Sequence, residues 1–346
     1  MKKQRTLLIC VETVDLDDRA YGFFNDWLLE LERQNIKAIV ICLRKGRMSA
    51  FAQHEIITLP RPGAFLALRR LFELWRISWD RRHEYSAVFV RQAPVFVMAS
   101  GWLWRLLGMR IILWYAHYKG RWDLNIAACI AHVVVTSVPE ACRIWSRKAI
   151  AIGQSIDTDR FRIPATKAHN GFRALVLGRV SLVKRVDEII DVFETSAFKT
   201  MHGSLTIIGK ATDRAYEKKI LELVGEHAGI RWMREGLPFD ALPSELSKYD
   251  FLMNFYEGSL DKAILECMAC GIIPLISTDA AENFFPESLH WLIARTKGAR
   301  LSAIEKLSGF SFADRQKISS QLRDIVVHEH SLSHQVHRLM EIANQR

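Results

Sequence analysis

Short apolar runs alternate with segments of helical spacing, twice along the chain, and this alternation constrains the fold more than any other feature. The first half opens with the apolar run 6–11, continues with apolar side chains at helical spacing over 23–31, and reaches a second apolar run at 37–43. A strand, a helix and a strand in this order form a βαβ unit, because buried parallel strands are continuous apolar runs. Further runs extend the predicted sheet at 87–90, 111–114 and 133–136.

A second alternation follows a polar, turn-rich stretch. Strands are predicted at 173–177, 204–208, 230–233, 251–255 and 273–277, and the tail 302–345 is predicted to be helical. We therefore expect two doubly wound α/β domains, at 1–150 and 171–330, a linker at 151–170 and a final helix at 331–346 that packs back on the first domain. Ligands bind at the carboxyl ends of such strands, so a shared cleft between the domains is expected.

The charge of the chain is unevenly distributed. The formal net charge is +10, and residues 1–150 hold 23 Lys and Arg against 13 Asp and Glu, so the whole surplus lies in the first domain. This asymmetry predicts either an anionic partner (phospholipid, nucleic acid or a phosphorylated substrate) or simply a solubilising surface. The six scattered cysteines and the absence of a signal-peptide pattern or a predicted membrane span favour a cytoplasmic setting without disulfides.

Two segments that each follow a predicted strand are candidates for phosphate binding. In the segment 178–187, Arg179 and Lys184 place two cations beside a predicted helix N-terminus, which suits a phosphate or diphosphate. In the segment 258–271, the backbone amides near 260–262 would lie at another helix N-terminus. Glu266 follows about one turn later, and a carboxylate there can accept hydrogen bonds from a ribose diol. A capped helix with a basic loop explains either segment alone.

The Cys267-x-x-Cys270 pair is interpreted as structural. No second such pair or paired histidine accompanies it, and small buried residues before a glycine C-cap account for both thiols.

Taken together, GRVSLVKRVD, LTIIGKA and SLDKAILECMACGIIPLIS resemble the donor domain of retaining glycosyltransferases of the GT-B fold. The family is family four, the "glycosyl transferases group one" domain. The segment 152–161 resembles the family's interdomain linker, and parts of the first half resemble a bacterial subset that builds surface polysaccharides such as lipopolysaccharide. The resemblance implies an α/β fold with two Rossmann-like domains, the first binding the acceptor and the second the nucleotide sugar.

The resemblance also implies roles for individual residues. Arg179 and Lys184 would hold the donor diphosphate and stabilise the leaving charge, and Glu266 would bind the donor ribose. The helix N-terminal amides that would meet the diphosphate belong to Leu260, Asp261 and Lys262.

In the first domain, Gly22 would let the diphosphate and sugar approach the first loop, and His117 would reach the cleft near the transferred sugar. Three positions depart from the family pattern: Gly258 stands where the first glutamate of a Glu-x7-Glu motif belongs, with Glu257 one position early; Ser155 replaces a glycine of the linker; and Arg91 stands where related sequences often carry histidine. We favour a variant in which Asp261 and Lys262 replace the first glutamate.

The implied reaction moves a sugar from a UDP-sugar or GDP-sugar to a glycan, with retention and with no cofactor or metal, since protein cations stabilise the leaving diphosphate. The alternatives are a GT-B enzyme of other chemistry, such as a sugar-nucleotide epimerase or a phosphorylase, and a non-catalytic nucleotide-sugar-binding protein. Nucleic acid would explain the charge but not Arg179, Lys184 and Glu266, so it is not expected as a partner.

The segment 66–83 mixes five arginines with leucine, phenylalanine and tryptophan. A basic amphipathic helix of this kind can lie in a lipid interface, although it can equally cover a sheet with an arginine-rich outer face. With the charge of the first domain, it suggests an acceptor linked to polyprenyl diphosphate and peripheral association with an anionic membrane.

Overall fold

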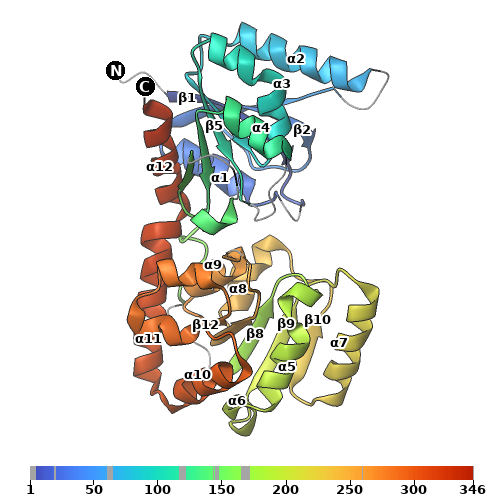
Figure 1. The fold of residues 1–346 in the computed structure, drawn as a ribbon, viewed down its shortest axis with the longest axis vertical. Coiled ribbons are helices and arrows are strands. Elements are labelled where there is room, and N and C mark those ends of the chain that lie inside the picture. The colour runs from blue at the N-terminus through green and yellow to red at the C-terminus, as the bar shows by residue number, and fades with distance from the viewer. Residues whose placement is uncertain are drawn as a thin grey trace. The chain divides into compact units, whose positions relative to one another are not determined.

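The computed structural model describes residues 5–18, 21–60, 65–116, 122–142, 144, 148–164, 172–258 and 260–345. The chain divides into two compact units (Figure 1). Unit 1 comprises Met1–Ser155 together with Leu332–Arg346, and unit 2 comprises Ile156–Ser331. The chain therefore leaves unit 1 after Ser155 and returns to it at Leu332.

Unit 1 is built on a sheet of seven parallel strands in the order β3-β2-β1-β4-β5-β6-β7. The strands are β1 (Arg5–Val14), β2 (Ile36–Lys45), β3 (Glu55–Thr58), β4 (Ala87–Arg91), β5 (Arg110–Trp114), β6 (Val133–Thr136) and β7 (Ala149–Ala151). The order changes direction between β1 and β4, which is the switch point at which open sheets of this type bind ligands.

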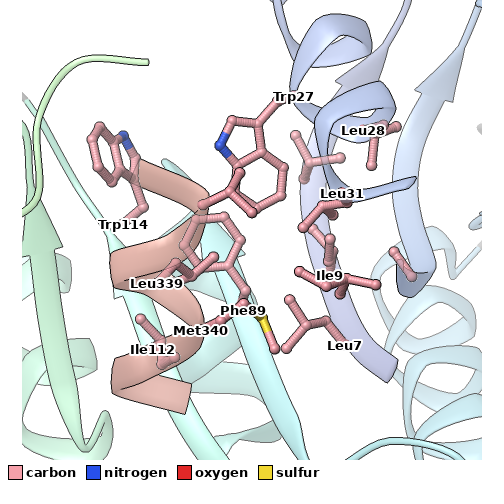
Figure 2. Packing of buried hydrophobic residues seen from close by; sticks show 14 of the residues in the cluster. Leu7, Ile9, Trp27, Leu28, Leu31, Phe89, Ile112, Trp114, Leu339 and Met340 are labelled. Carbon is pink, nitrogen blue, oxygen red and sulfur yellow. The ribbon is translucent and has the colours of Figure 1, made fainter. Parts of the chain in front are cut away.

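Helices cover both faces of the unit 1 sheet, as its unbroken apolar strands require. One face packs against α1 (Phe24–Arg33) and α12 (Leu332–Asn344), and Figure 2 shows Leu339 and Met340 of α12 among side chains of the sheet and of α1. The other face packs against α2 (Leu66–Asp80), α3 (Pro94–Leu106) and α4 (Trp122–Ile130). A short 3-10 helix, η1 (Pro139–Ala141), follows β6.

The last helix is tied to unit 1 by polar contacts as well as apolar ones. The indole nitrogen of Trp27 donates to Oε1 of Gln335 at 3.1 Å, and Nε2 of Gln335 donates to the carbonyl of Gly153 at 2.8 Å. Gln335 is 1% exposed, so these bonds satisfy a buried amide that would otherwise oppose folding.

Unit 2 contains a five-stranded parallel sheet in the order β10-β9-β8-β11-β12. Its strands are β8 (Arg173–Leu177), β9 (Ser204–Ile208), β10 (Ile230–Met233), β11 (Phe251–Asn254) and β12 (Ile273–Ile276). Its α-helices are α5 (Val186–Glu194), α6 (Ala197–Thr200), α7 (Arg214–Glu226), α8 (Leu242–Leu246), α9 (Lys262–Ala269), α10 (Lys297–Gly309) and α11 (Phe312–Ile325). The 3-10 helices are η2 (Leu182–Lys184), η3 (Phe239–Ala241), η4 (Asp279–Asn283) and η5 (Glu287–Leu292), and η6 (Val326–His330) is a π-helix.

The doubly wound sheets predicted from the apolar runs are thus present in both units. Two strands, β3 and β7, were not predicted, because they are edge strands of only four and three residues whose side chains are partly buried or exposed. In the part of the chain that the structure describes, no helix is long and apolar enough to cross a membrane.

Candidate functional site

Two glycines bring the loops after β8 and β9 together in unit 2. Gly178 has φ +121° and Gly209 has φ +149°, a conformation that favours glycine. A Cβ atom on Gly209 would collide with the carbonyl oxygen of Gly178. The amide of Val180 donates to the carbonyl of Lys210 at 3.0 Å, which continues the contact between the loops. The side chain of Arg179, between these anchor points, is exposed.

Lys184 and Asp261, 77 positions apart, meet at the carboxyl ends of β8 and β11. The ammonium group of Lys184, at the end of η2, pairs with the carboxylate of Asp261. The Lys184 Nζ also lies 4.1 Å from the centre of the Tyr256 ring. Asn254 Nδ2 donates to Oδ2 of Asp261 at 3.0 Å. Lys184 is thereby held by a carboxylate and an aromatic ring, with 13% of its side chain exposed.

The carboxylate of Asp261 is turned toward Lys184 and away from the helix that it precedes. Asp261 is the N-cap residue of α9, but its side chain makes no capping hydrogen bond. Asp and Asn at this position usually accept from the amides of the first turn. The N-terminus of α9 thus lacks its own anionic cap, and Leu260, just before it, is buried with 2% exposure. This end of α9 carries the partial positive charge that suits an anion.

Glu266 lies one turn along α9 and is buried, with 6% exposure. Its Oε1 atom lies 3.6 Å from Nζ of Lys262, the first residue of the helix. Burial raises the pKa of Glu266, and the Lys262 charge partly opposes that rise. A buried carboxylate with one cation beside it retains capacity to accept hydrogen bonds from hydroxyl groups.

Gly258 stands at the position where the family pattern has the first glutamate of its Glu-x7-Glu motif. The carbonyl of Gly258 accepts from Oγ1 of Thr278 at 2.7 Å, and a Cβ atom on Gly258 would collide with the Tyr256 ring. The carboxylate of Glu257 pairs with Arg185 at 2.9 Å. Glu257 therefore forms an ion pair with Arg185, the residue that precedes α5.

In unit 1, Gly22 is required by the loop that contains it. A Cβ atom there would lie 2.8 Å from the carbonyl oxygen of Leu16 and 3.0 Å from that of Asp18. The neighbouring Tyr21 hydroxyl donates to Oε2 of Glu12 at 3.0 Å. Burial, together with this hydrogen bond, raises the pKa of Tyr21 to about 12. His117, the other residue expected to act in this domain, lies outside the described residues.

No protein-family model matches the sequence, and no curated protein matches it significantly. Solved structures, in contrast, are similar over nearly the whole chain. HepE (Alr3699) from Anabaena, in complex with UDP and glucose, superimposes with a TM-score of 0.73 at 12% identity, covering 98% of this chain and 99% of HepE. A glycosyltransferase from Rickettsia africae ESF-5 gives 0.73 at 14% identity, covering 98% of both chains. The apo lipopolysaccharide outer core galactosyltransferase WaaB gives 0.68 at 11% identity, covering 98% of both chains.

The chain has the GT-B fold of these glycosyltransferases. At this level of identity the similarity establishes the fold, whereas the chemistry has to be argued from the site. Within this fold, unit 2 brings together Lys184, Asp261, Lys262 and Glu266, as the contacts above show. Arg179 makes no ion pair with any residue that the structure describes.

Sequence reasoning missed three residues of the site: Asn254, Tyr256 and Arg185. Asn254 and Tyr256 stand at the end of the apolar run that forms β11, and polar residues at such an end were a usable signal. The pairing of Arg185 with Glu257 had no sequence signal, because the two residues belong to different loops.

Among the described residues, no group of three or more His, Cys, Asp or Glu side chains is arranged to hold a metal ion. The six cysteines are free thiols, and Cys267 and Cys270 are buried in the interior of unit 2. Burial raises the pKa of both thiols, which keeps them protonated and unreactive at neutral pH.

Proposed function

We propose that this chain is a retaining glycosyltransferase that moves a sugar from a nucleotide-diphosphate sugar to a glycan. The observation that carries the proposal is the grouping of Lys184, the uncapped N-terminus of α9 and buried Glu266 at the carboxyl edge of the unit 2 sheet. A diphosphate suits the cation and the helix end, and a ribose diol suits the carboxylate. The fold supports the same function, since structures of this fold include HepE complexes with UDP and with UDP-glucose.

In the proposed reaction, the oxygen of an acceptor hydroxyl forms a bond to the anomeric carbon while the bond from that carbon to the β-phosphate oxygen breaks. The electron pair of the broken bond stays with the phosphate, which also takes the acceptor proton. Attack and departure on the same face retain the configuration. Arg179 and Lys184 supply positive charge to the leaving diphosphate, and such preorganised charge commonly contributes several kcal/mol. The reaction needs no cofactor, and we expect it to continue in the presence of EDTA.

Substitution of the two central side chains tests the proposal. Lys184→Ala should reduce turnover at least about a hundredfold, since it removes a charged contact that strengthens during the reaction. Glu266→Ala should reduce kcat/KM mainly through a higher KM for the nucleotide sugar, since it removes a contact to the ribose. The matched control is Lys218→Ala, a lysine of α7 whose side chain is 82% exposed. Product is measured by mass spectrometry after a screen of UDP-sugars and GDP-sugars, with circular dichroism as a check of folding.

Three outcomes separate this function from its alternatives. Turnover and KM in both variants that equal those of the control would remove the assignment of the site. Binding of UDP or GDP by calorimetry without any product would indicate a non-catalytic nucleotide-sugar-binding protein. A changed sugar nucleotide with no acceptor consumed would indicate an epimerase.

We further propose that the acceptor is lipid-linked, for example to polyprenyl diphosphate, and that unit 1 lies on an anionic membrane surface. The outer side of α2 exposes large apolar side chains: Phe72 is 72% exposed, Leu68 59% and Trp79 51%. Arg69 and Arg76 of the same helix are also exposed. A basic helix with exposed aromatic residues suits the interface of an anionic bilayer. An arginine-rich solvent face alone does not account for these apolar groups.

Flotation with vesicles tests the membrane proposal. We expect binding to vesicles that contain phosphatidylglycerol, weakened by salt and by Phe72→Ser combined with Trp79→Ser. The matched control is Phe312→Ser, an exposed phenylalanine of α11 in unit 2. Equal flotation of the double variant and the control would show that α2 is not the contact.

A further inference from the structure

A cation is buried in unit 1, and no residue that the structure describes there places an anion beside it. Arg91 is the last residue of β4, next to the switch point of the sheet, and is 4% exposed. Its guanidinium carbon lies 4.8 Å from the centre of the Phe23 ring and 5.0 Å from that of Trp114. The ring of Phe24 is 5.9 Å away. Aromatic faces of this kind stabilise the charge only in part.

Two of the three guanidinium nitrogens of Arg91 have no hydrogen-bond acceptor. Its Nε and Nη1 atoms are buried and donate to no acceptor, and Arg91 forms no ion pair with any residue in the described part of the chain. The Glu12 carboxylate accepts from the Tyr21 hydroxyl. Burial lowers the pKa of Arg91 to about 9, the direction expected for a cation removed from water. Buried charges in folded proteins are normally paired, so the fold alone does not explain this residue.

The surroundings of Arg91 favour an anion from outside the chain. Phe23 and Phe24 form the N-cap and first residue of α1, a helix of ten residues, so the guanidinium lies near the positive end of that helix. The guanidinium charge and the partial positive charge at the helix N-terminus repel each other, whereas a bound anion would be attracted by both. Tyr21 and Phe23 are only partly buried, so solvent reaches the side of the Arg91 surroundings that these two residues form.

We propose that Arg91 binds an anionic group, a carboxylate or a phosphate, of the sugar acceptor. The planar guanidinium presents paired N–H donors that match either oxyanion, and the flanking rings fix its plane. The assignment to the acceptor rests on the proposed function, in which the donor phosphates are held by the cations of unit 2. The anion site itself does not depend on that function.

The side-chain Nε–H resonance of Arg91 in the ¹⁵N-labelled full chain, assigned by its loss in Arg91→Met, reports on the site directly. Three probes are titrated separately: glucuronate as a carboxylate, inorganic phosphate as a phosphate, and glucose as a neutral control. We expect a saturable shift with one of the two anions and none with glucose. The anion that gives the saturable shift shows whether Arg91 binds a carboxylate or a phosphate. No saturable shift with either anion would overturn the proposal.

Thermal unfolding gives a second readout. The effective anion should raise the melting temperature of the wild type and of Arg33→Met, whose arginine at the far end of α1 is 56% exposed, but not that of Arg91→Met. Without an anion, Arg91→Met should melt no lower than the wild type, because an unpaired buried charge has been removed. A lower melting temperature together with an unchanged response to the anion would show a structural role.

A conservative variant keeps the test decisive if Arg91→Met does not fold. Arg91→Lys retains the charge but loses the paired donors, and should weaken the affinity for the anion about tenfold. Equal affinity in Arg91→Lys and the wild type would overturn the proposal. The outcome is separate from that of the donor site, because these probes require no nucleotide sugar: an enzyme without turnover can still show the Arg91 shift, and an active enzyme can lack it.

Discussion

At the scale of single residues, unit 2 shows how far sequence patterns carry. Lys184, Asp261 and Glu266 were singled out because each stands near the start of a helix that follows a buried strand. The pairing of Lys184 with Asp261 could not be predicted, because spacing along the chain does not say which loops meet. Arg91 was noticed only as an unusual residue. Arginine is rarely buried, so its near-complete burial required the structure.

The burial of Glu266 predicts how stability depends on pH. Because its pKa is raised in the folded state, its stabilising contribution is full below the unfolded pKa and is lost as the pH rises through the folded pKa. Glu266→Gln removes this loss. The variant should therefore be more stable than the wild type at pH 8, and the difference should disappear near pH 4. Urea denaturation across this range measures it. A difference that is constant with pH would show that Glu266 does not titrate in this way.

At the scale of elements, the buried strands were predicted, whereas the two edge strands of unit 1 were not. Parallel strands that are covered on both faces must be apolar at every position, which makes them visible in the sequence. The edge strands β3 and β7 are only four and three residues long, and their residues are partly buried or exposed, which makes them hard to distinguish from loops. The conformation of the loops that follow the strands depends on backbone geometry. In the sequence, the signal for such geometry is a glycine, as at Gly178 and Gly209.

Gly209→Ala should separate the loops that carry the candidate site. Alanine is disfavoured at φ +149°, and its methyl group would collide with the Gly178 carbonyl, so we expect a loss of about 3 kcal/mol in the free energy of unfolding. The matched control is Gly225→Ala, inside α7 with open space around its Cβ, which should gain up to about 1 kcal/mol. Urea denaturation measures both. Equal stability of the two variants would contradict the close packing of Gly209 against Gly178.

At the scale of the whole molecule, the last helix matters most. The final segment was expected to return to the first domain, although the amphipathic pattern of 332–344 alone does not predict this return. That pattern shows an apolar face but not the sheet that the face covers. In the structure, α12 contributes Leu332, Val336, Leu339, Met340 and Ile342 to the core of unit 1. Unit 1 therefore cannot complete its core without residues 332–342.

This arrangement predicts that the two units respond to different perturbations. UDP should raise the melting temperature of unit 2, where the candidate donor site lies. Leu339→Ala should destabilise unit 1 by about 2–5 kcal/mol, because the leucine is fully buried between α12 and the sheet (Figure 2). His337→Ala, on the same helix with the histidine side chain 71% exposed, is the control. In scanning calorimetry, Leu339→Ala should lower a transition that UDP does not shift. If it lowered the UDP-sensitive transition instead, α12 would support unit 2 and the assignment of the last helix would be wrong.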